Sequence, residues 1–186
     1  MTEFQWPWEY TFPPFFTLQP HEETRQQQLK VWTDLFLKYL RHTNKFTLSI
    51  GDQNSPLFHN ESLKRRLSPE LVLAILGELE RSGHANPLDK RRQEWQVYWF
   101  TLEEYGNMVY DWVQETGQTN TICTLYEIAS GENTSHLDFH GVDEAVLLSA
   151  LRLLEEKGRC ELIEMDGSHG VSSSKVPVLW NYVLMK

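Results

Sequence analysis

The sequence has only two cysteines, Cys123 and Cys160, and no CxxC spacing. Two thiols cannot supply the disulfide framework of a small secreted protein or the ligand set of a structural zinc site. Cys123 lies in an apolar run and Cys160 in a predicted strand, which favours buried core thiols over nucleophiles. The scarcity of cysteine therefore indicates a reducing compartment.

Long apolar runs and basic residues are also scarce. No stretch approaches the roughly 20 apolar residues of a membrane-spanning helix, and the N-terminal residues lack the basic region of a signal peptide. Lysine and arginine number 17 against 26 aspartates and glutamates, a formal net charge of −9. Such a chain repels polyanions, so nucleic acid and acidic lipid are disfavoured partners and any membrane association is expected to be indirect. These features predict a soluble intracellular protein.

Catalytic motifs are scarce as well. No nucleophile with a nearby base, paired carboxylates or phosphate-binding glycine loop stands out. The nearest approach to a metal site is a polar loop that contains His136, Asp138 and His140, with His169 further along. A His-x3-His spacing fixes ligand geometry only on a helix, so we interpret this segment as an ordinary loop. The sequence predicts no enzyme, no metal site and no cofactor.

What the chain does have is 40% hydrophobic and 12% aromatic residues, enough to form a core. Helical periodicity, a Ser-Pro helix start and glycine stops divide the first half into regular elements. These are a helix at 23–40, a strand at 46–50, a short helix at 61–67, a helix at 68–82, and strands at 85–88 and 95–100. Helix, strand, helix, helix and hairpin is the order of a winged helix.

The second half repeats this order. The predicted elements are a helix at 101–117, a strand at 121–124, a short helix at 125–129, a helix at 143–157 and a strand at 159–165. An offset of 75 positions relates Gly158 to Gly83. The same offset superposes the apolar positions of the helices at 68–82 and 143–157, which indicates a diverged tandem repeat. We therefore predict an α+β, mostly helical fold of two tandem winged helices, with a boundary near residue 101.

Winged helices often bind DNA through their third helix, but charge argues against that function here. The helices at 68–82 and 143–157 each carry a net charge of −2, which opposes entry into a phosphate-lined groove. Two basic triplets, at 64–66 and 90–92, are the contrary observation, because they can meet on one edge of the first repeat. A nucleic-acid-binding or transcription-associated protein therefore stays open as the alternative function.

Residues 4–20 are rich in aromatic residues and interrupted by four prolines. Proline fixes its own φ and restricts the preceding residue, which predicts an extended, polyproline-like arm with its rings pointing outward. Exposed rings on a stiff segment favour docking into a groove of another protein. The alternative is that the arm folds back onto the first repeat and completes its core. Under the docking interpretation, a chain without residues 1–16 is expected to fold but not to assemble.

The arm also carries a resemblance to a known family. The segments WPWEY at 6–10 and FPPFFTLQP at 12–20 resemble the N-terminus of the vacuolar protein sorting-associated protein 25 family, the small subunit of the ESCRT-II complex. Further matches are SPLF at 55–58, TLYE at 124–127 and FHG at 139–141, and the likeness extends from residue 4 to about 171. The residues after about 171, SSSKVPVLWNYVLMK, do not match, so the last wing strand is expected near 176–183 or is lost.

The resemblance implies a non-enzymatic assembly subunit with a PPXY-like arm at 1–20 and winged helices at 21–100 and 101–186. Two copies would join one copy of each of two larger ESCRT-II subunits in a heterotetramer. The arm residues implied to bind those subunits are Trp6, Pro7, Trp8, Tyr10, Pro13, Pro14, Phe15 and Phe16. The second winged helix would recruit an ESCRT-III subunit for multivesicular body sorting of ubiquitinated cargo. The implied location is cytoplasmic, with recruitment to endosomes and a possible nuclear pool.

Overall fold

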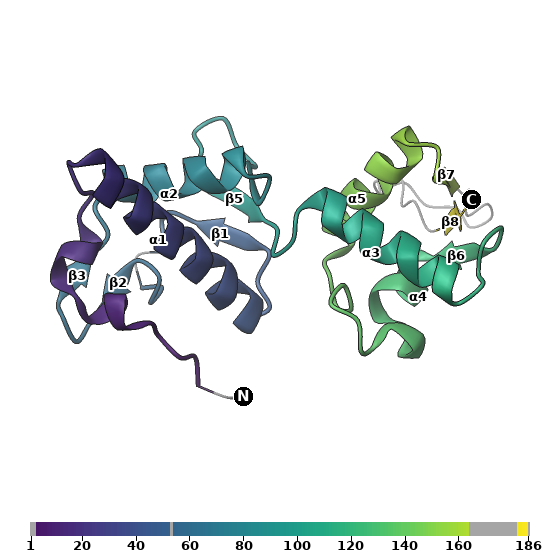
Figure 1. Ribbon diagram of the computed structural model, residues 1–186, viewed down its shortest axis with the longest axis horizontal. Coiled ribbons are helices and arrows are strands. Elements are labelled where there is room, and N and C mark those ends of the chain that lie inside the picture. Colours follow the sequence, from purple (N-terminus) through teal and green to yellow (C-terminus); the bar gives the residue numbers. More distant parts are fainter. Residues whose placement is uncertain (1–2, 53, 164–181, 186) are drawn as a thin grey trace, which may run out of the picture. The chain divides into compact units, whose positions relative to one another are not determined.

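The structure is a computed structural model that describes residues 3–52, 54–163 and 182–185. Two helices that pack against a three-stranded sheet form its first part (Figure 1). The chain divides into two units, Met1–Trp99 and Phe100–Lys186, and residues 1–20 belong to the first. The main elements of the first unit are α1 (Glu22–His42), α2 (Pro69–Arg81), β1 (Thr47–Ser49), β4 (Ala85–Pro87) and β5 (Glu94–Val97). That α1, α2 and the hairpin lie in the predicted order supports the winged-helix prediction.

Helix α2 shows how local sequence sets these boundaries. Its N-cap residue Ser68 accepts a hydrogen bond from the Leu71 amide at 3.3 Å, and Pro69 takes the first helical position, where a missing N–H costs nothing. Gly83 follows the helix with φ of 80°, the left-handed conformation that glycine adopts without strain. One apolar face is buried in the core: Leu71, Val72, Ile75, Leu76 and Leu79.

Strand β5 is the middle strand of the first sheet and pairs antiparallel with both β1 and β4. The wing turn between β4 and β5 is held by the Asp89 carboxylate, which accepts hydrogen bonds from the backbone amides of Arg91, Gln93 and Glu94 at 2.8–3.0 Å. These donors, the Glu94 amide first among them, lower the pKa of Asp89. Asp89 therefore orders the turn that carries the second basic triplet.

The predicted short helix at 61–67 is wrong. The chain forms instead a small antiparallel hairpin of β2 (His59–Asn60) and β3 (Arg65–Arg66). The Asn60 side chain accepts from the Leu63 amide at 3.0 Å, and Lys64 adopts φ of 51°. An asparagine that hydrogen-bonds its own backbone favours a turn over a helix, which accounts for the difference.

The second unit repeats the arrangement. Its elements are α3 (Leu102–Glu115), β6 (Ile122–Thr124), α4 (Leu125–Ser130), η3 (Glu132–Thr134), α5 (Glu144–Glu156), β7 (Cys160–Ile163) and β8 (Tyr182–Met185). Helices α2 and α5 begin and end 75 positions apart, and their buried residues coincide at that offset, as the repeat predicts. Cys123 and Cys160 are buried free thiols, as predicted, and burial raises the pKa of Cys123.

Strand β8 lies between β6 and β7 in the second sheet. Its Val183 and Met185 side chains are fully buried, and Val183 pairs with both Cys123 and Leu162. The last wing strand therefore ends two residues beyond the predicted segment at 176–183, most of which lies outside the described residues. The central place of β8 makes Val183 and Met185 part of the core of the second unit.

Candidate protein interaction site

The arm is not extended. It forms two short 3-10 helices, η1 (Trp8–Thr11) and η2 (Pro13–Phe16), which fold against α1 of the first unit. Tyr10, Phe15 and Phe16 are 7%, 6% and 1% exposed and belong to the core of this unit. The prediction that the rings point outward is therefore wrong for these three residues. Proline dictates local stiffness, but it does not prevent a turn from packing its rings inward.

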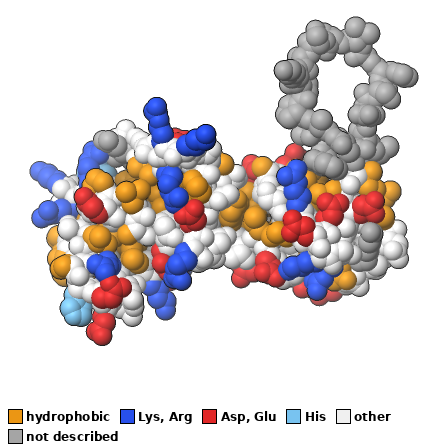
Figure 2. Space-filling model, turned by 90° about the horizontal axis from the view of Figure 1, so that it is seen from above, with side chains coloured by type: hydrophobic (Ala, Val, Ile, Leu, Met, Phe, Trp, Pro, Cys, Tyr) orange, Lys and Arg blue, Asp and Glu red, His pale blue; other side chains and the backbone are white. Residues whose placement is uncertain are grey.

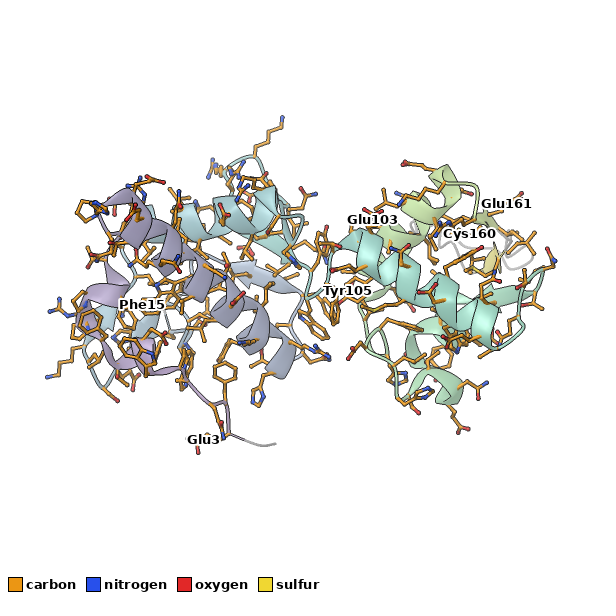
Figure 3. The ribbon with its side chains drawn as sticks, viewed as in Figure 1. Glu3, Phe15, Glu103, Tyr105, Cys160 and Glu161 are labelled. Carbon is orange, nitrogen blue, oxygen red and sulfur yellow. The ribbon has the colours of Figure 1, made fainter. Side chains whose placement is uncertain are left out.

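Aromatic packing holds the arm on α1. The Phe15 ring stacks on the Trp32 indole with a centroid distance of 4.3 Å and an interplanar angle of 7°, and it lies between the arm and α1 in Figure 3. The Phe16 ring meets the same indole edge-on at 5.5 Å. Trp6 stacks on Tyr10 at 4.0 Å. Such pairs add about 0.5–1.5 kcal/mol each beyond the burial of their apolar surface.

Buried polar side chains of the first unit bind the arm backbone. Gln28 donates to the carbonyls of Phe15 and Thr17 at 2.9 and 2.8 Å, and Trp32 Nε1 donates to the Phe15 carbonyl at 2.8 Å. Asn60 donates to the Tyr10 carbonyl at 2.9 Å. We call Gln28, Trp32 and Asn60 the backbone clamp. A buried carbonyl without a donor is costly, so the clamp selects this one path for the arm.

Tyr10 is fixed at both ends. Its hydroxyl donates to the Pro56 carbonyl at 2.6 Å, while its own carbonyl is held by Asn60. Burial, with a smaller contribution from Tyr39, raises the pKa of Tyr10 to about 12. The neutral phenol is thus the form that the fold stabilises.

The remaining arm residues form the candidate site. Trp8 is 70% exposed and Phe12 is 50% exposed, and their ring centroids lie 6.4 Å apart. Pro13 and Pro14 are exposed beside them. A groove of about 380 Å³ opens between Trp8, Phe12 and Pro14 and the outer face of α1, where Val31 and Gln27 contribute to its lining. We call Trp8, Phe12, Pro13 and Pro14 the arm face.

The structure therefore divides the eight predicted binding residues. Trp8, Pro13 and Pro14 lie on the arm face, Trp6 and Pro7 are half-buried, and the other three are core residues. Sequence reasoning missed Phe12, although its spacing of four from Trp8 was a usable signal. It also missed the backbone clamp, because Gln28 and Asn60 have no local signature of a binding partner 13 or 50 positions away.

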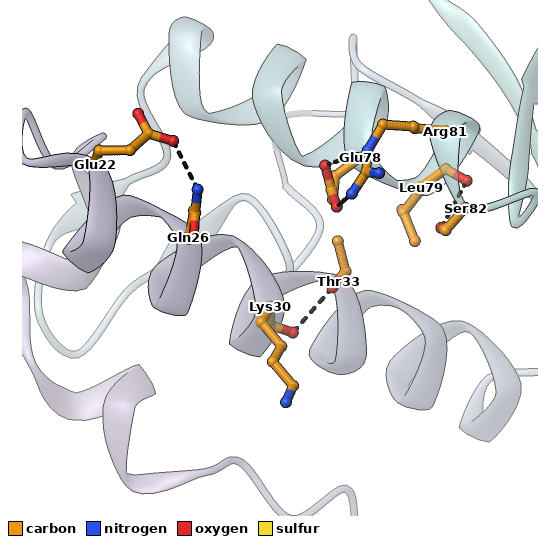
Figure 4. A network of polar contacts seen from close by, with 8 residues as sticks. All are labelled: Glu22, Gln26, Lys30, Thr33, Glu78, Leu79, Arg81 and Ser82. Carbon is orange, nitrogen blue, oxygen red and sulfur yellow. Dashed lines mark hydrogen bonds and ion pairs between the residues drawn. The ribbon is translucent and has the colours of Figure 1, made fainter.

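A second groove of the first unit has no comparable chemistry. It measures about 620 Å³ and lies between α1 and α2. Every dashed contact in Figure 4 stays within one helix and its C-cap residue, such as Glu22 with Gln26 and Glu78 with Arg81. These polar side chains satisfy one another locally, so the groove is interpreted as the solvated seam between two helices.

The remaining candidates from the sequence are the histidine-containing polar loop and the two basic triplets. Within the described residues, no group of three His, Cys, Asp or Glu side chains is placed to hold a metal ion, and His169 lies outside them. His140 Nδ1 lies 3.0 Å from the Thr134 hydroxyl, which gives it a partner within its own loop. Of the two basic triplets, only Arg66 lines a groove, together with Gln93, the residue after the second triplet, and Arg92 pairs with Glu80.

Comparison with known proteins decides the family. The ESCRT-II complex subunit model matches residues 9–143, which include all of η1 but its first residue, the whole of η2 and the whole backbone clamp. This chain belongs to the ESCRT-II complex subunit family. The family is non-enzymatic, as the sequence predicted, and its members act in endosomal trafficking.

Relatives in several animals support the assignment. The chain is 98% identical over 171 residues to vacuolar protein-sorting-associated protein 25 of Drosophila melanogaster, an alignment that covers 92% of this chain and 98% of the relative. It is 43% identical over 169 residues to the protein of that name in Homo sapiens, covering 90% and 96%.

The fold class is confirmed by solved structures. Subunit VPS25 of the endosomal trafficking complex ESCRT-II superposes with a TM-score of 0.79 at 24% identity, covering 97% of this chain and 98% of that one. The corresponding chain in the ESCRT-II endosomal trafficking complex gives 0.76 at 24%, covering 96% and 98%. Among the described helices of this chain, none is long and apolar enough to cross a membrane.

Proposed function

We propose that this chain is the assembly subunit of an ESCRT-II complex and that its arm face docks onto the two larger subunits. The observation that carries the proposal is the exposure of Trp8 and Phe12 on an arm whose backbone is otherwise fixed. A related crystal structure contains VPS22, VPS25 and VPS36 together, which supports VPS22-like and VPS36-like partners here. Two copies of this chain would join one of each.

A rigid aromatic epitope suits this role. Trp is enriched among interface hot spots, and truncation of such a residue commonly costs about 2 kcal/mol or more of binding free energy. The backbone clamp immobilises the arm before it binds, so docking loses less conformational entropy than a flexible arm would lose. The proposed epitope is thus preformed by the core rather than folded by the partner.

The assay is co-purification of the two larger subunits with tagged variants of this chain. We expect W8S/F12S to weaken assembly at least 100-fold, because two hot-spot rings are removed. L73S/L88S is the matched control, since Leu73 and Leu88 are 55% and 56% exposed elsewhere in the same unit. Equal assembly of both double variants would exclude the arm face. Apolar docking also predicts little change between low and high salt, whereas phosphate-driven binding weakens steeply.

We propose in addition that the chain is cytoplasmic until its complex is recruited to endosomes. We also propose that the second unit recruits an ESCRT-III subunit during multivesicular body sorting of ubiquitinated cargo. Charge supports a separate role for this unit. The first unit carries twelve basic and twelve acidic residues, whereas the second carries five basic and fourteen acidic residues. The whole net charge of −9 therefore resides in the second unit. Binding of a purified ESCRT-III subunit to the assembled complex tests this role, and no binding would exclude it.

A further inference from the structure

Basic side chains of the first unit are concentrated on two hairpins. These hairpins, residues 59–66 and 85–97, together contain six lysines and arginines but three acidic residues, a net charge of +3 in a chain whose net charge is −9. Blue side chains project beyond the outline of the first unit in Figure 2. The two hairpins are therefore a local cationic region on an acidic protein.

Four of these basic side chains have no partner of their own. Lys64 and Arg65 on the first hairpin, and Lys90 and Arg91 on the wing turn, are exposed, and within the described part of the chain none of them forms an ion pair. Arg92 differs, because it pairs with a glutamate of α2 and lies over the Trp95 ring. The four unpaired cations can therefore face an external anion.

The acidic residues of the wing are already occupied. The Asp89 carboxylate accepts three backbone amides of its own turn, and the Glu94 carboxylate accepts from the Ser49 hydroxyl at 2.6 Å. The first hairpin is likewise ordered, since Asn60 accepts from the Leu63 amide at 3.0 Å. Both basic turns are thus held in place before any ligand arrives, which lowers the entropy lost on binding.

Exposed leucines lie beside the basic turns. Leu73 on α2 is 55% exposed and Leu88 in the wing is 56% exposed, and outside the arm face no other large hydrophobic side chain of the first unit is exposed within the described residues. A groove of about 510 Å³ places Leu73 with Arg66 of the first hairpin and Gln93 of the wing. Its floor consists of buried side chains: Phe58, Leu67 and Val72. Both hairpins and the exposed part of α2 therefore meet at one surface.

We call this surface the hairpin face, and its members are Lys64, Arg65, Leu73, Leu88, Lys90 and Arg91. Charges in water are largely screened beyond about 8 Å at physiological ionic strength, so the charge of the hairpin face outweighs that of the distant acidic residues for anything that touches it. Cations that surround exposed leucines are the composition of a surface that adsorbs to acidic lipid, where headgroups attract the cations and the leucines enter the interface.

A nucleic acid suits the hairpin face less well. The part of α2 that lines the groove belongs to the segment 68–82, whose net charge is −2, and a duplex groove would have to accept that helix. A layer of headgroups needs to contact only the projecting turns. The phosphate backbone of a duplex also offers nothing apolar to Leu73 and Leu88.

We propose that the hairpin face binds the surface of an acidic lipid bilayer directly. This contact goes beyond the proposed function, because it requires neither of the larger subunits. It also differs from the indirect membrane association expected from the net charge of the whole chain, since that net charge resides in the second unit.

The first test is co-sedimentation of the full chain with phosphatidylcholine vesicles that contain about 30% phosphatidylserine. Binding is expected to these vesicles and not to pure phosphatidylcholine vesicles, and it should weaken as salt is added. Each basic residue near such a surface strengthens binding about fivefold, so K64Q/K90Q is expected to weaken it about 20-fold. K30Q/K38Q is the matched control, because it removes two exposed lysines from α1 of the same unit, and it should bind within about twofold of the unmodified chain. Equal weakening in the two variants, or no binding to acidic vesicles, would overturn the proposal.

The leucines are tested on the same vesicles. L73S/L88S is expected to weaken binding at least threefold, whereas W8S/F12S, which removes two exposed rings from the arm face, should leave it unchanged. The co-purification assay should give the reverse, with assembly lost in W8S/F12S and kept in L73S/L88S. If W8S/F12S weakens vesicle binding as much as L73S/L88S, the arm rather than the hairpin face contacts the lipid and the proposal is wrong.

A nucleic-acid titration and the assembly assay complete the set. A duplex of about 20 base pairs is expected to bind more weakly than the acidic vesicles. Tighter binding of the duplex, lost in K64Q/K90Q, would assign the hairpin face to nucleic acid instead of lipid. Absence of vesicle binding by a chain that still assembles refutes only the lipid contact, and loss of vesicle binding is not expected from variants that fail to assemble.

Discussion

Replacement of Phe16 by alanine tests whether the arm belongs to the core of the first unit. Phe16 is 1% exposed and packs against Tyr10, Phe15 and Trp32, with ring centroids 5.4–6.3 Å away. Removal of a fully buried phenylalanine ring costs about 3–5 kcal/mol in unfolding free energy. The loss of three aromatic neighbours and a cavity in a rigid environment favour the upper half of that range.

Phe12→Ala is the matched variant, because it removes the same ring from a half-exposed position four residues earlier. We expect it to cost less than about 1 kcal/mol, as surface substitutions generally do. Unfolding in urea, followed by tryptophan fluorescence, measures both values. The two units can unfold separately, so the effect of Phe16→Ala should be confined to one transition.

In the co-purification assay the order of the two effects is expected to reverse, with the larger loss for Phe12→Ala. Phe12→Ala is expected to weaken co-purification with the larger subunits while the chain stays folded. The assay is run at a temperature at which both variants are folded. If Phe16→Ala destabilises no more than Phe12→Ala, the arm is not part of the core and the backbone clamp has been misinterpreted. Because the arm is part of the core, a chain without residues 1–16 should lose cooperative unfolding of the first unit. This is the opposite of the expectation from the sequence, in which the shortened chain folds.

Three more outcomes follow from the contacts described above. The raised pKa of Tyr10 stabilises the fold fully below pH about 10, and this contribution is lost as the pH rises toward about 12. Tyr10→Phe should therefore flatten the decline of the unfolding free energy between these two pH values. An unchanged slope would contradict this. Gln28→Leu leaves the Gln19 amide without its acceptor and removes one of the two donors to each of the Phe15 and Thr17 carbonyls, so it should cost about 1–3 kcal/mol. Faster amide hydrogen exchange at residues 15–19 is the specific sign, and uniform exchange changes would argue against the clamp. Met185→Ala should cost about 2–5 kcal/mol in the unfolding of the second unit, whereas no effect would mean that β8 is not a core strand.

The helices were predictable because their signals are local. The apolar periodicity of α2 and α5, the Ser68 cap and the Thr101–Glu104 capping box all act within a few residues, so sequence alone indicated the helices to within two residues at each end. The 75-residue offset then indicated the repeat, because two winged helices bury equivalent faces.

The arm was harder to predict, because its conformation depends on distant residues. Whether Tyr10 points inward is decided by Asn60 and Pro56, some 50 positions away, and nothing in the arm itself records those contacts. The β2–β3 hairpin was missed for a related reason. Two-residue strands give no periodicity, and the turn depends on the single side chain of Asn60.

The backbone clamp has a practical consequence for engineering this chain. Gln28, Trp32 and Asn60 grip main-chain atoms of the arm and leave the outward rings untouched. The side chains at positions 8 and 12 can therefore be exchanged without rebuilding the scaffold beneath them. A library randomised at those two sites would present new anchors in a fixed geometry, and selection from it could redirect the subunit to a foreign receptor.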